Sequence, residues 1–364
     1  MSGYLNVRDI DWGMLLIALV ICALGVMQIF SAAHGSAAWQ DAWWKQIVWI
    51  VGGVLLMWIA TYIDYHALMN HVTPLYMLSV GLLVTVLLVG KRAFGSTRWI
   101  PLAPGFHFQV SEFVKLVIIL LVARFMTELR GDDLELRDLV KISALIGVPM
   151  LLVIGEPDLG TALTYIPILA VGAFLGGLNW RYVAAIGIIV ALALPVGIRF
   201  LQPYQKARLV SFLDPEGDPK GTGYQVIESK IAVGAGGMWG KGMAKGSQTQ
   251  LRFLPVAHTD FIFSAFSEER GFVGVVVVLA LYFMLLMQIV KNAQTAPDRA
   301  GMYICMGVAA LVLFHVLVNV GMVVGRMPVT GIPLPLMSAG GSSMLSIFLM
   351  LGLVNNVRLR RFVN

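Results

Sequence analysis

The stretch WGMLLIALVICALGVMQIF, residues 12–30, decides the fold class of this chain. It contains no charged residue, and a run of this length can cross the roughly 30 Å hydrocarbon core of a bilayer as a helix. The run GVVVVLALYFMLLMQIV, residues 274–290, has the same character. The two runs predict membrane-spanning helices in both halves of the chain.

Composition extends this prediction to the whole chain. The 364 residues are 58% hydrophobic and 13% charged, with a mean hydropathy of +0.82. A soluble domain carries about 25% charged residues. The composition therefore indicates an all-α polytopic membrane protein. The net charge of +6 reports on the sidedness of loops, and no nucleic-acid partner is expected.

The apolar pattern predicts about ten spans in a single transmembrane domain covering 1–364. An even number of spans places both termini on one side of the membrane. Lysine and arginine are more frequent in the short segments that would be cytoplasmic if the N-terminus is inside, so we expect both termini in the cytoplasm. The predicted spans are 12–31, 43–62, 74–90, 110–127, 142–155, 161–178, 183–200, 271–290, 302–324 and 343–357.

The long segment 201–270, between the seventh and eighth spans, would then be external. Its stretch GYQVIESKIAVGAGG, residues 223–237, has the spacing of a short helix. The glycine-rich GAGGMWGKG, residues 234–242, is similar to a phosphate-binding loop but fails that pattern at Ala235 and Gly242. Tight turns are the favoured interpretation, although Lys241 could meet a phosphate as a point charge.

Charges within the fourth predicted span raise a functional question. In FHFQVSEFVKLVIILL, residues 106–121, Glu112 and Lys115 are three positions apart and share one helix face. Charged residues inside a span are costly and are candidates for function. The alternative is a structural pair whose charges neutralise each other.

Two further segments interrupt the hydrophobic pattern. GEPDLGTA, residues 155–162, is either a broken helix lining a cavity or a plain turn in which Asp158 caps the next helix. GRMPVTGIPLPLMSAGGSS, residues 325–343, cannot be regular helix because of its prolines. It is either a packed re-entrant loop or the wall of a cavity.

A lone acid stands near the end of the external segment, in FLPVAHTDFIFSAF, residues 253–266. Asp260 could cap a short helix that begins with the following phenylalanine, or it could carry chemistry. A Ser-His-Asp hydrolase is a weak alternative, because no sequence motif identifies a serine or cysteine as a nucleophile.

Taken together, these motifs resemble the SEDS family (shape, elongation, division and sporulation), and its RodA branch more than its FtsW branch. The resemblance covers essentially the whole chain, and HTDFIF, PVTGIPLP and GGSS are its most specific parts. The motifs that carry it occur in the order GSTRWIPL, FQVSEFVK, EPDLGTAL, FLDPEGDPKGTGYQVIESKIAVGAGGMWGKG, QTQLRFLPVAHTDFIF and PVTGIPLPLMSAGGSS.

The resemblance implies ten spans, a large external loop and location in the bacterial cytoplasmic (inner) membrane. It implies a peptidoglycan glycosyltransferase that polymerises lipid II, a disaccharide-peptide on a polyprenyl diphosphate, into glycan strands during cell elongation. Its partners would be lipid II, the growing glycan strand, membrane lipid and a class B penicillin-binding protein, which is a transpeptidase. No nucleotide is needed, because the lipid-diphosphate bond supplies the energy.

The resemblance also implies roles for single residues. The essential acid of the family falls on Asp260, as general base or as ligand of a divalent cation such as Mg or Mn. The α-linked donor and β-linked product require one inverting displacement, in which cations stabilise the departing diphosphate. The candidate substrate-binding residues are Arg98, Glu112, Lys115, Asp158, Lys206, Arg208, Lys241, His258, Thr259, Ser342 and Ser343.

Three positions depart from the pattern of the family. Val110 replaces a proline, Val256 replaces an acid, and Ala339 replaces an aromatic residue. Two other functions stay open on the sequence. Polytopic helices with charges in their spans also fit a flippase for the lipid-linked precursor, and the chain could be a non-catalytic scaffold for the penicillin-binding protein.

Overall fold

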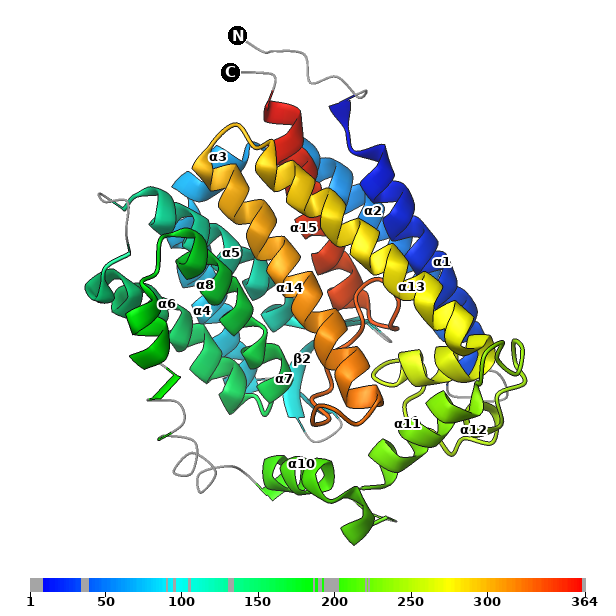
Figure 1. Cartoon of the computed structure of the whole chain (residues 1–364). Helices are drawn as coiled ribbons and strands as arrows, with labels where there is room; N and C mark the ends of the chain where they lie inside the picture. The colour runs from blue at the N-terminus through cyan, green and yellow to red at the C-terminus, as the bar shows by residue number, and fades with distance from the viewer. Residues whose placement is uncertain are drawn as a thin grey trace.

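The structure is a computed structural model of the chain. It describes all residues except 1–8, 34–38, 90, 94–95, 104–105, 130–133, 186, 189–191, 193–202, 220, 222 and 362–364. Helices dominate the described part (Figure 1). They are α1 (Trp12–Ala33), α2 (Ala42–Tyr62), α3 (Tyr65–Asn70), α4 (Val72–Val89), α5 (Val110–Thr127), α6 (Leu136–Gly155), α7 (Leu159–Leu163), α8 (Tyr165–Leu175), α10 (Pro203–Leu213), the 3-10 helix η2 (Pro215–Gly217), α11 (Tyr224–Ala235), α12 (Ser247–Gln250), α13 (Ile262–Gln294), α14 (Arg299–Val323) and α15 (Gly341–Arg360).

Seven of these helices, α1, α2, α4, α6, α13, α14 and α15, are long and apolar enough to cross a membrane. Each overlaps one of the predicted spans, so the prediction of a polytopic helical membrane protein is confirmed. Helix α5 is 18 residues long but carries Glu112, Lys115 and Arg124. The predicted span 161–178 is a shorter apolar helical segment, Leu159–Leu175, and the predicted span 183–200 lies mainly outside the described residues.

The start of α1 and the end of α15 lie at one end of the bundle, which we call the terminal end, whereas α10, α11 and α12 lie at the opposite end, the loop end (Figure 1). At the terminal end, Arg358 Nη1 donates to Asp11 Oδ2 at 2.9 Å, and the Asp11 amide donates to Asn355 Oδ1 at 3.0 Å. This arrangement agrees with an even number of membrane crossings.

A small sheet corrects the expectation of a purely α-helical chain. Strands β1 (Lys91–Ala93), β2 (Ser96–Ala103) and β3 (Phe106–Phe108) form an antiparallel sheet in the order β1-β2-β3 at the loop end. The β2–β3 ladder is irregular between Pro101 and Ala103, and proline has no N–H to donate there. The sheet holds Arg98 beside the start of α7.

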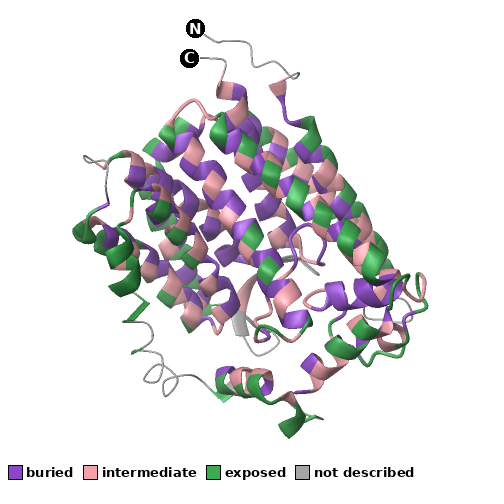
Figure 2. Cartoon of the chain, in the orientation of Figure 1, coloured by how far each residue is buried: buried purple, intermediate pink, exposed green. Residues whose placement is uncertain are grey.

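The centre of the bundle consists of α14 and α15, whose residues are mostly buried, while α1, α2, α4 and α6 present exposed side chains outward (Figure 2). Glycines let α15 lie close to α2. A Cβ added at Gly352 would lie 2.6 Å from the Met57 carbonyl oxygen, and one added at Gly53 would meet the Phe348 ring. Close contact between small residues is a common way for helices to pack within a membrane.

Helix α13 is two helical segments joined at Gly271, which has φ 65° and ψ −169°. All side chains from Ile262 to Glu269 are buried, and this first segment crosses the loop end of the bundle before the second segment enters the span (Figure 2). The kink therefore brings the residues just before α13, including Asp260, towards the middle of the bundle.

Candidate active site

Asp260 lies in the turn before α13 and is held there through its neighbours' backbone. Its carbonyl oxygen accepts a hydrogen bond from Asn319 Nδ2 at 3.0 Å, and the Thr259 carbonyl accepts from Ser338 Oγ at 2.8 Å. The N-cap of α13 is Phe261. The interpretation of Asp260 as a helix cap is therefore wrong, and its carboxylate is available for another purpose.

The charges of two arginines and of Asp158 act on the Asp260 carboxylate. Burial raises the pKa of Asp260, while the positive charges of Arg208 and Arg98 act in the opposite direction. A Cβ added at Gly331 would lie 3.4 Å from Asp260 Oδ2 and 3.9 Å from Arg208 Nη1. The absence of a side chain at Gly331 therefore leaves space between the acid and the cation from α10.

Asp158 connects Arg98 to the helices behind it. Arg98 Nη1 lies 3.5 Å from Asp158 Oδ1, and Gln109 Nε2 donates to Asp158 Oδ2 at 2.9 Å. The Gln109 amide in turn donates to Ser342 Oγ at 3.0 Å. Asp158 also accepts from the Thr161 amide as the N-cap of α7, so the capping interpretation of this acid is confirmed.

The segment 325–343 is a packed loop, because Ile332, Leu334, Leu336 and Met337 are almost completely buried. It also borders the site on one side. A Cβ added at Gly160 of α7 would lie 2.5 Å from the Thr330 carbonyl oxygen. The two interpretations of this loop from the sequence are therefore compatible.

Glu112 and Lys115 form a buried ion pair, with Nζ 2.6 Å from Oε1. Ser346 Oγ donates to Glu112 Oε2 at 3.3 Å, and His315 Nε2 lies 3.4 Å from Lys115 Nζ. His315 Nδ1 lies 3.1 Å from the carbonyl oxygen of Pro333, in the packed loop. This network thus links α5, α14 and α15 to the segment that borders Asp260.

The other predicted residues are more widely spread. Lys241 is bound to Ser247 and Glu268, with Nζ 2.9 Å from Glu268 Oε1, and Lys206 is exposed on α10. His258 is buried, with its ring 4.3 Å from that of Trp39, and burial lowers the pKa of His258 to about 4. The imidazole is therefore neutral near pH 7. The Ser343 carbonyl accepts from Ser346 Oγ, one turn along α15.

The sequence interpretation did not single out Glu156, Gln109, His315 and Trp39. Burial, and to a smaller degree the charge of Asp158, raise the pKa of Glu156 to about 8, against the effect of Arg98. Glu156 and Gln109 belong to the same motifs as the predicted site residues Asp158 and Glu112. Their positions in those motifs could therefore have identified them from the sequence. No local pattern in the sequence marks His315 or Trp39, because each contacts a predicted site residue from a distant segment of the chain.

Among the described residues, no group of three or more His, Cys, Asp or Glu side chains could hold a metal ion. The charged groups that act on Asp260 are two arginines, which disfavour a cation, and Asp158, which favours one. The described side chains around Asp260 therefore do not by themselves fit a resident metal ion.

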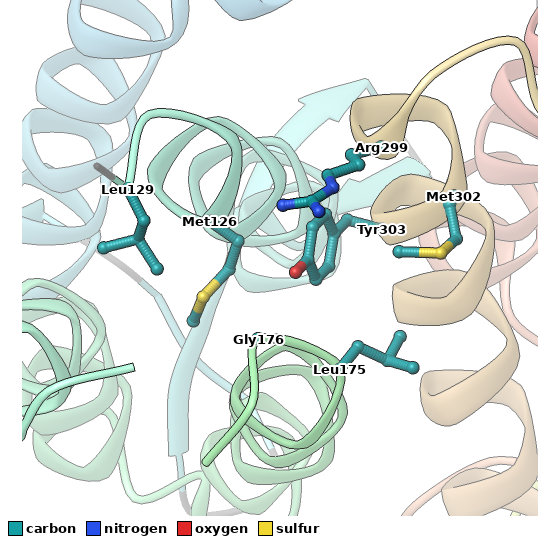
Figure 3. A pocket seen from close by; sticks show the side chains of 7 residues that line it. All are labelled: Met126, Leu129, Leu175, Gly176, Arg299, Met302 and Tyr303. Carbon is teal, nitrogen blue, oxygen red and sulfur yellow. The ribbon is translucent and has the colours of Figure 1, made fainter. Parts of the chain in front are cut away.

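A hollow elsewhere in the bundle contains none of the predicted site residues. It has a volume of about 360 Å³ and lies among the ends of α5 and α8 and the start of α14 (Figure 3). Its polar groups come from Arg299 and Tyr303. We therefore place the candidate site around Asp260 and not in this hollow.

Replacing Arg208 with glutamine is expected to shift the acidic limb of the pH–activity profile to higher pH. As the expected general base, Asp260 must be ionised to accept a proton, and loss of the nearby cation favours its protonated form. The pKa should rise by roughly one unit. Lys206→Gln is the matched control, since it removes one positive charge from an exposed side chain of the same helix, α10. An unmoved limb in Arg208→Gln would contradict the assignment of the limb to Asp260.

Comparison with known proteins gives matches over nearly the whole chain. The FtsW/RodA/SpoVE family of cell cycle proteins matches residues 11–361. The chain is 32% identical to the peptidoglycan glycosyltransferase RodA of Treponema pallidum, across 98% of this chain and 99% of that protein. It is 37% identical to the peptidoglycan glycosyltransferase MrdB of Escherichia coli, across 97% of this chain and 94% of that protein.

Two solved structures also match nearly the whole chain. A chain from a peptidoglycan synthase complex, described as coordinating polymerization and crosslinking, has a TM-score of 0.84 and 34% identity, with 98% of this chain and 99% of that chain covered. The rod shape determining protein RodA of Thermus thermophilus has a TM-score of 0.72 and 30% identity, with 97% and 98% covered.

Proposed function

The chain belongs to the FtsW/RodA/SpoVE family, and from that premise we propose that it is a peptidoglycan glycosyltransferase that polymerises lipid II. The observation that carries this proposal is the carboxylate of Asp260, with Arg208 and Arg98 close enough to oppose the effect of burial on its pKa. One base and adjacent cations are what an inverting transfer from a lipid diphosphate requires.

In the proposed reaction, Asp260 takes the proton from the 4-hydroxyl of the acceptor sugar. The freed oxygen forms a bond to the anomeric carbon of the donor, and the bond from that carbon to the diphosphate oxygen breaks. Arg208 and Arg98 stabilise the negative charge on the departing diphosphate. Partial burial of Asp260 strengthens it as a base, because burial raises its pKa.

Asp260 is the residue that would hold a divalent cation brought in with the diphosphate, and such a cation would supply positive charge to the departing group. Magnesium is commonly held by one or two carboxylates together with substrate phosphates. Glu112, Lys115 and Asp158 position the walls of the site in this proposal, through the contacts of Gln109 and Ser346.

Purified protein with lipid II in detergent provides the test, with glycan polymer as the product measured. A flippase needs two leaflets to show its activity, whereas polymerisation does not. Polymer formed in detergent supports the transferase. Absence of polymer from folded protein, together with transfer of lipid II between leaflets of a vesicle, would support the flippase instead.

We propose a transpeptidase of the class B penicillin-binding type as the partner. The similar synthase complex combines polymerization with crosslinking, and joining strands by crosslinks is the step that follows strand formation. We also propose that the loop end faces the outside of the cytoplasmic membrane and that both termini are cytoplasmic, because basic residues are more frequent in the short segments of the terminal side.

Cysteines placed at two exposed positions at opposite ends of the bundle test this orientation. Gly217 lies in η2, beyond α10, and Gln294 is the last residue of α13. A membrane-impermeant thiol reagent applied to intact cells is expected to label Gly217→Cys and not Gln294→Cys. Both should be labelled after the cells are opened. The reverse pattern in intact cells would overturn the orientation.

A further inference from the structure

The glycine-rich segment takes no part in the candidate site, yet it is bound closely to α13. We call residues 236–242 the Met-Trp loop. The Phe272 amide donates to the Gly237 carbonyl at 2.8 Å, and the Val273 amide donates to the Met238 carbonyl at 3.1 Å. On the other side of the kink, the Lys241 amide donates to the Glu268 carbonyl at 3.0 Å. The loop is therefore fixed to both segments of α13.

The glycines of the loop explain this close approach. Gly240 has φ 77°, a conformation that favours glycine. A Cβ at Gly240 would collide with the Glu269 carbonyl, and a Cβ at Gly271 would collide with the backbone of Gly240. The glycine pattern thus serves the contact between the loop and the kink, and no phosphate is needed to account for it.

Two large apolar side chains of the loop are mostly exposed among the described residues. Met238 is 59% exposed and Trp239 is 79% exposed, although their backbone is firmly bound. The neighbouring Phe272 is 58% exposed and opens the outward-facing apolar surface of α13, which continues through Val276 and Val277. The exposed side chains of the loop therefore lie next to the point where a membrane span begins.

We propose that the Met-Trp loop is an interfacial membrane anchor, in which Met238 and Trp239 enter the boundary between headgroups and acyl chains at the loop end. Lipid fits better than a protein partner, because the apolar surface is continuous with the lipid-facing side of α13. Tryptophan is enriched at this depth, and the exposed Lys245 nearby suits the headgroups.

The anchor would have a direct consequence for the site. The backbone of the Met-Trp loop is hydrogen-bonded to α13 on both sides of Gly271. Asp260 lies just before the first segment of α13, which ends at this kink. Lipid contact at Met238 and Trp239 would thereby set the depth of Asp260 relative to the membrane surface. The inference does not depend on the proposed reaction, since insertion of the loop can be measured without activity.

The test places an environment-sensitive fluorophore on single cysteines in full-length protein in phospholipid nanodiscs. Cys22 and Cys305 are both buried and are first replaced with alanine. The fluorophore is attached at Trp239→Cys, at Met238→Cys as a second position in the loop, and at Glu216→Cys as the control. Glu216 is exposed in η2 between Asp214 and Asp218.

Quenching is then compared between lipids that carry a nitroxide near the headgroup and aqueous iodide. Labels in the loop should be quenched by the nitroxide lipid about threefold more than the control label, as expected for a side chain at the interface, and should be protected from iodide. Iodide quenching equal to that at Glu216→Cys would overturn the proposal. Protection from both quenchers would overturn it as well, because it would mean that protein covers the loop.

Discussion

Replacing Asp260 with asparagine is expected to abolish glycan polymerisation while leaving the protein folded. Asparagine keeps the size of the side chain but cannot accept a proton from the sugar hydroxyl, and loss of a general base costs about 10²–10⁴ in rate. The backbone bonds from Asn319 and Ser338 that hold this turn do not involve the carboxylate. The melting temperature should therefore change little.

Glu216→Gln is the matched control for this variant, because it removes an exposed negative charge from the same segment, 201–270. It should polymerise lipid II as the unaltered protein does. Both variants are assayed as purified protein in detergent, with product length resolved on gels. Normal polymer from Asp260→Asn would exclude Asp260 both as base and as metal ligand.

Lys115→Met is expected to have the largest effect on stability. The change leaves the Glu112 carboxylate buried without its cation, and breaking a buried ion pair in this way costs about 3–5 kcal/mol. The side chains of Lys115 and Glu112 are only 1% and 3% exposed. Thermal unfolding in detergent should show a large fall in melting temperature, and polymerisation should be strongly reduced.

Lys141→Met provides the comparison. Lys141 pairs with Asp138 at the same spacing of three residues, but the two side chains are 51% and 23% exposed. An exposed pair contributes about 0–1 kcal/mol, so this variant should unfold almost as the unaltered protein does. A similar fall in both variants would show that burial is not the cause.

The double variant Glu112→Gln/Lys115→Met separates stability from function. It removes both charges and should recover much of the lost stability. If it also recovers full polymerisation, the pair is structural only. If the stable double variant stays inactive, the charges themselves are needed by the reaction.

The parts of the structure that depend on local spacing were predictable from the sequence. The apolar runs predicted the spanning helices. The three-residue spacing of Glu112 and Lys115 predicted that their side chains share one helix face, and the two side chains form an ion pair there. The helix from Tyr224 to Ala235 followed from its own periodicity in the same way. None of these features needs information about a distant segment.

Features that depend on long-range packing were not predictable. His315 reaches Lys115 from 200 positions along the chain, and nothing near either residue marks that contact. The strands β1 and β3 are three residues long. A strand of this length is too short to show the alternation of apolar and polar residues that predicts a strand. The eighth span was predicted to begin at Gly271, with a short helix before it only as an alternative. The complete burial of Ile262 to Glu269 depends on contacts with distant segments, which the local sequence does not show.

The central position of α15 has a consequence for the order in which the protein is made. Polar groups at the C-terminal end of α2 and the start of α3 find partners in α15: Asn356 Nδ2 donates to the Thr61 carbonyl at 2.7 Å, and the Tyr65 amide donates to Asn356 Oδ1 at 3.1 Å. Gln46 Nε2 donates to Ser338, just before α15. During synthesis from the N-terminus these groups have no such partners until the final segment emerges.

Polar side chains without partners are costly inside a membrane. The nascent chain must therefore carry these unsatisfied groups through most of its translation, and a ribosome that stops before α15 releases a protein without its centre. We expect such truncated chains to be degraded by membrane quality control instead of accumulating as shorter enzymes.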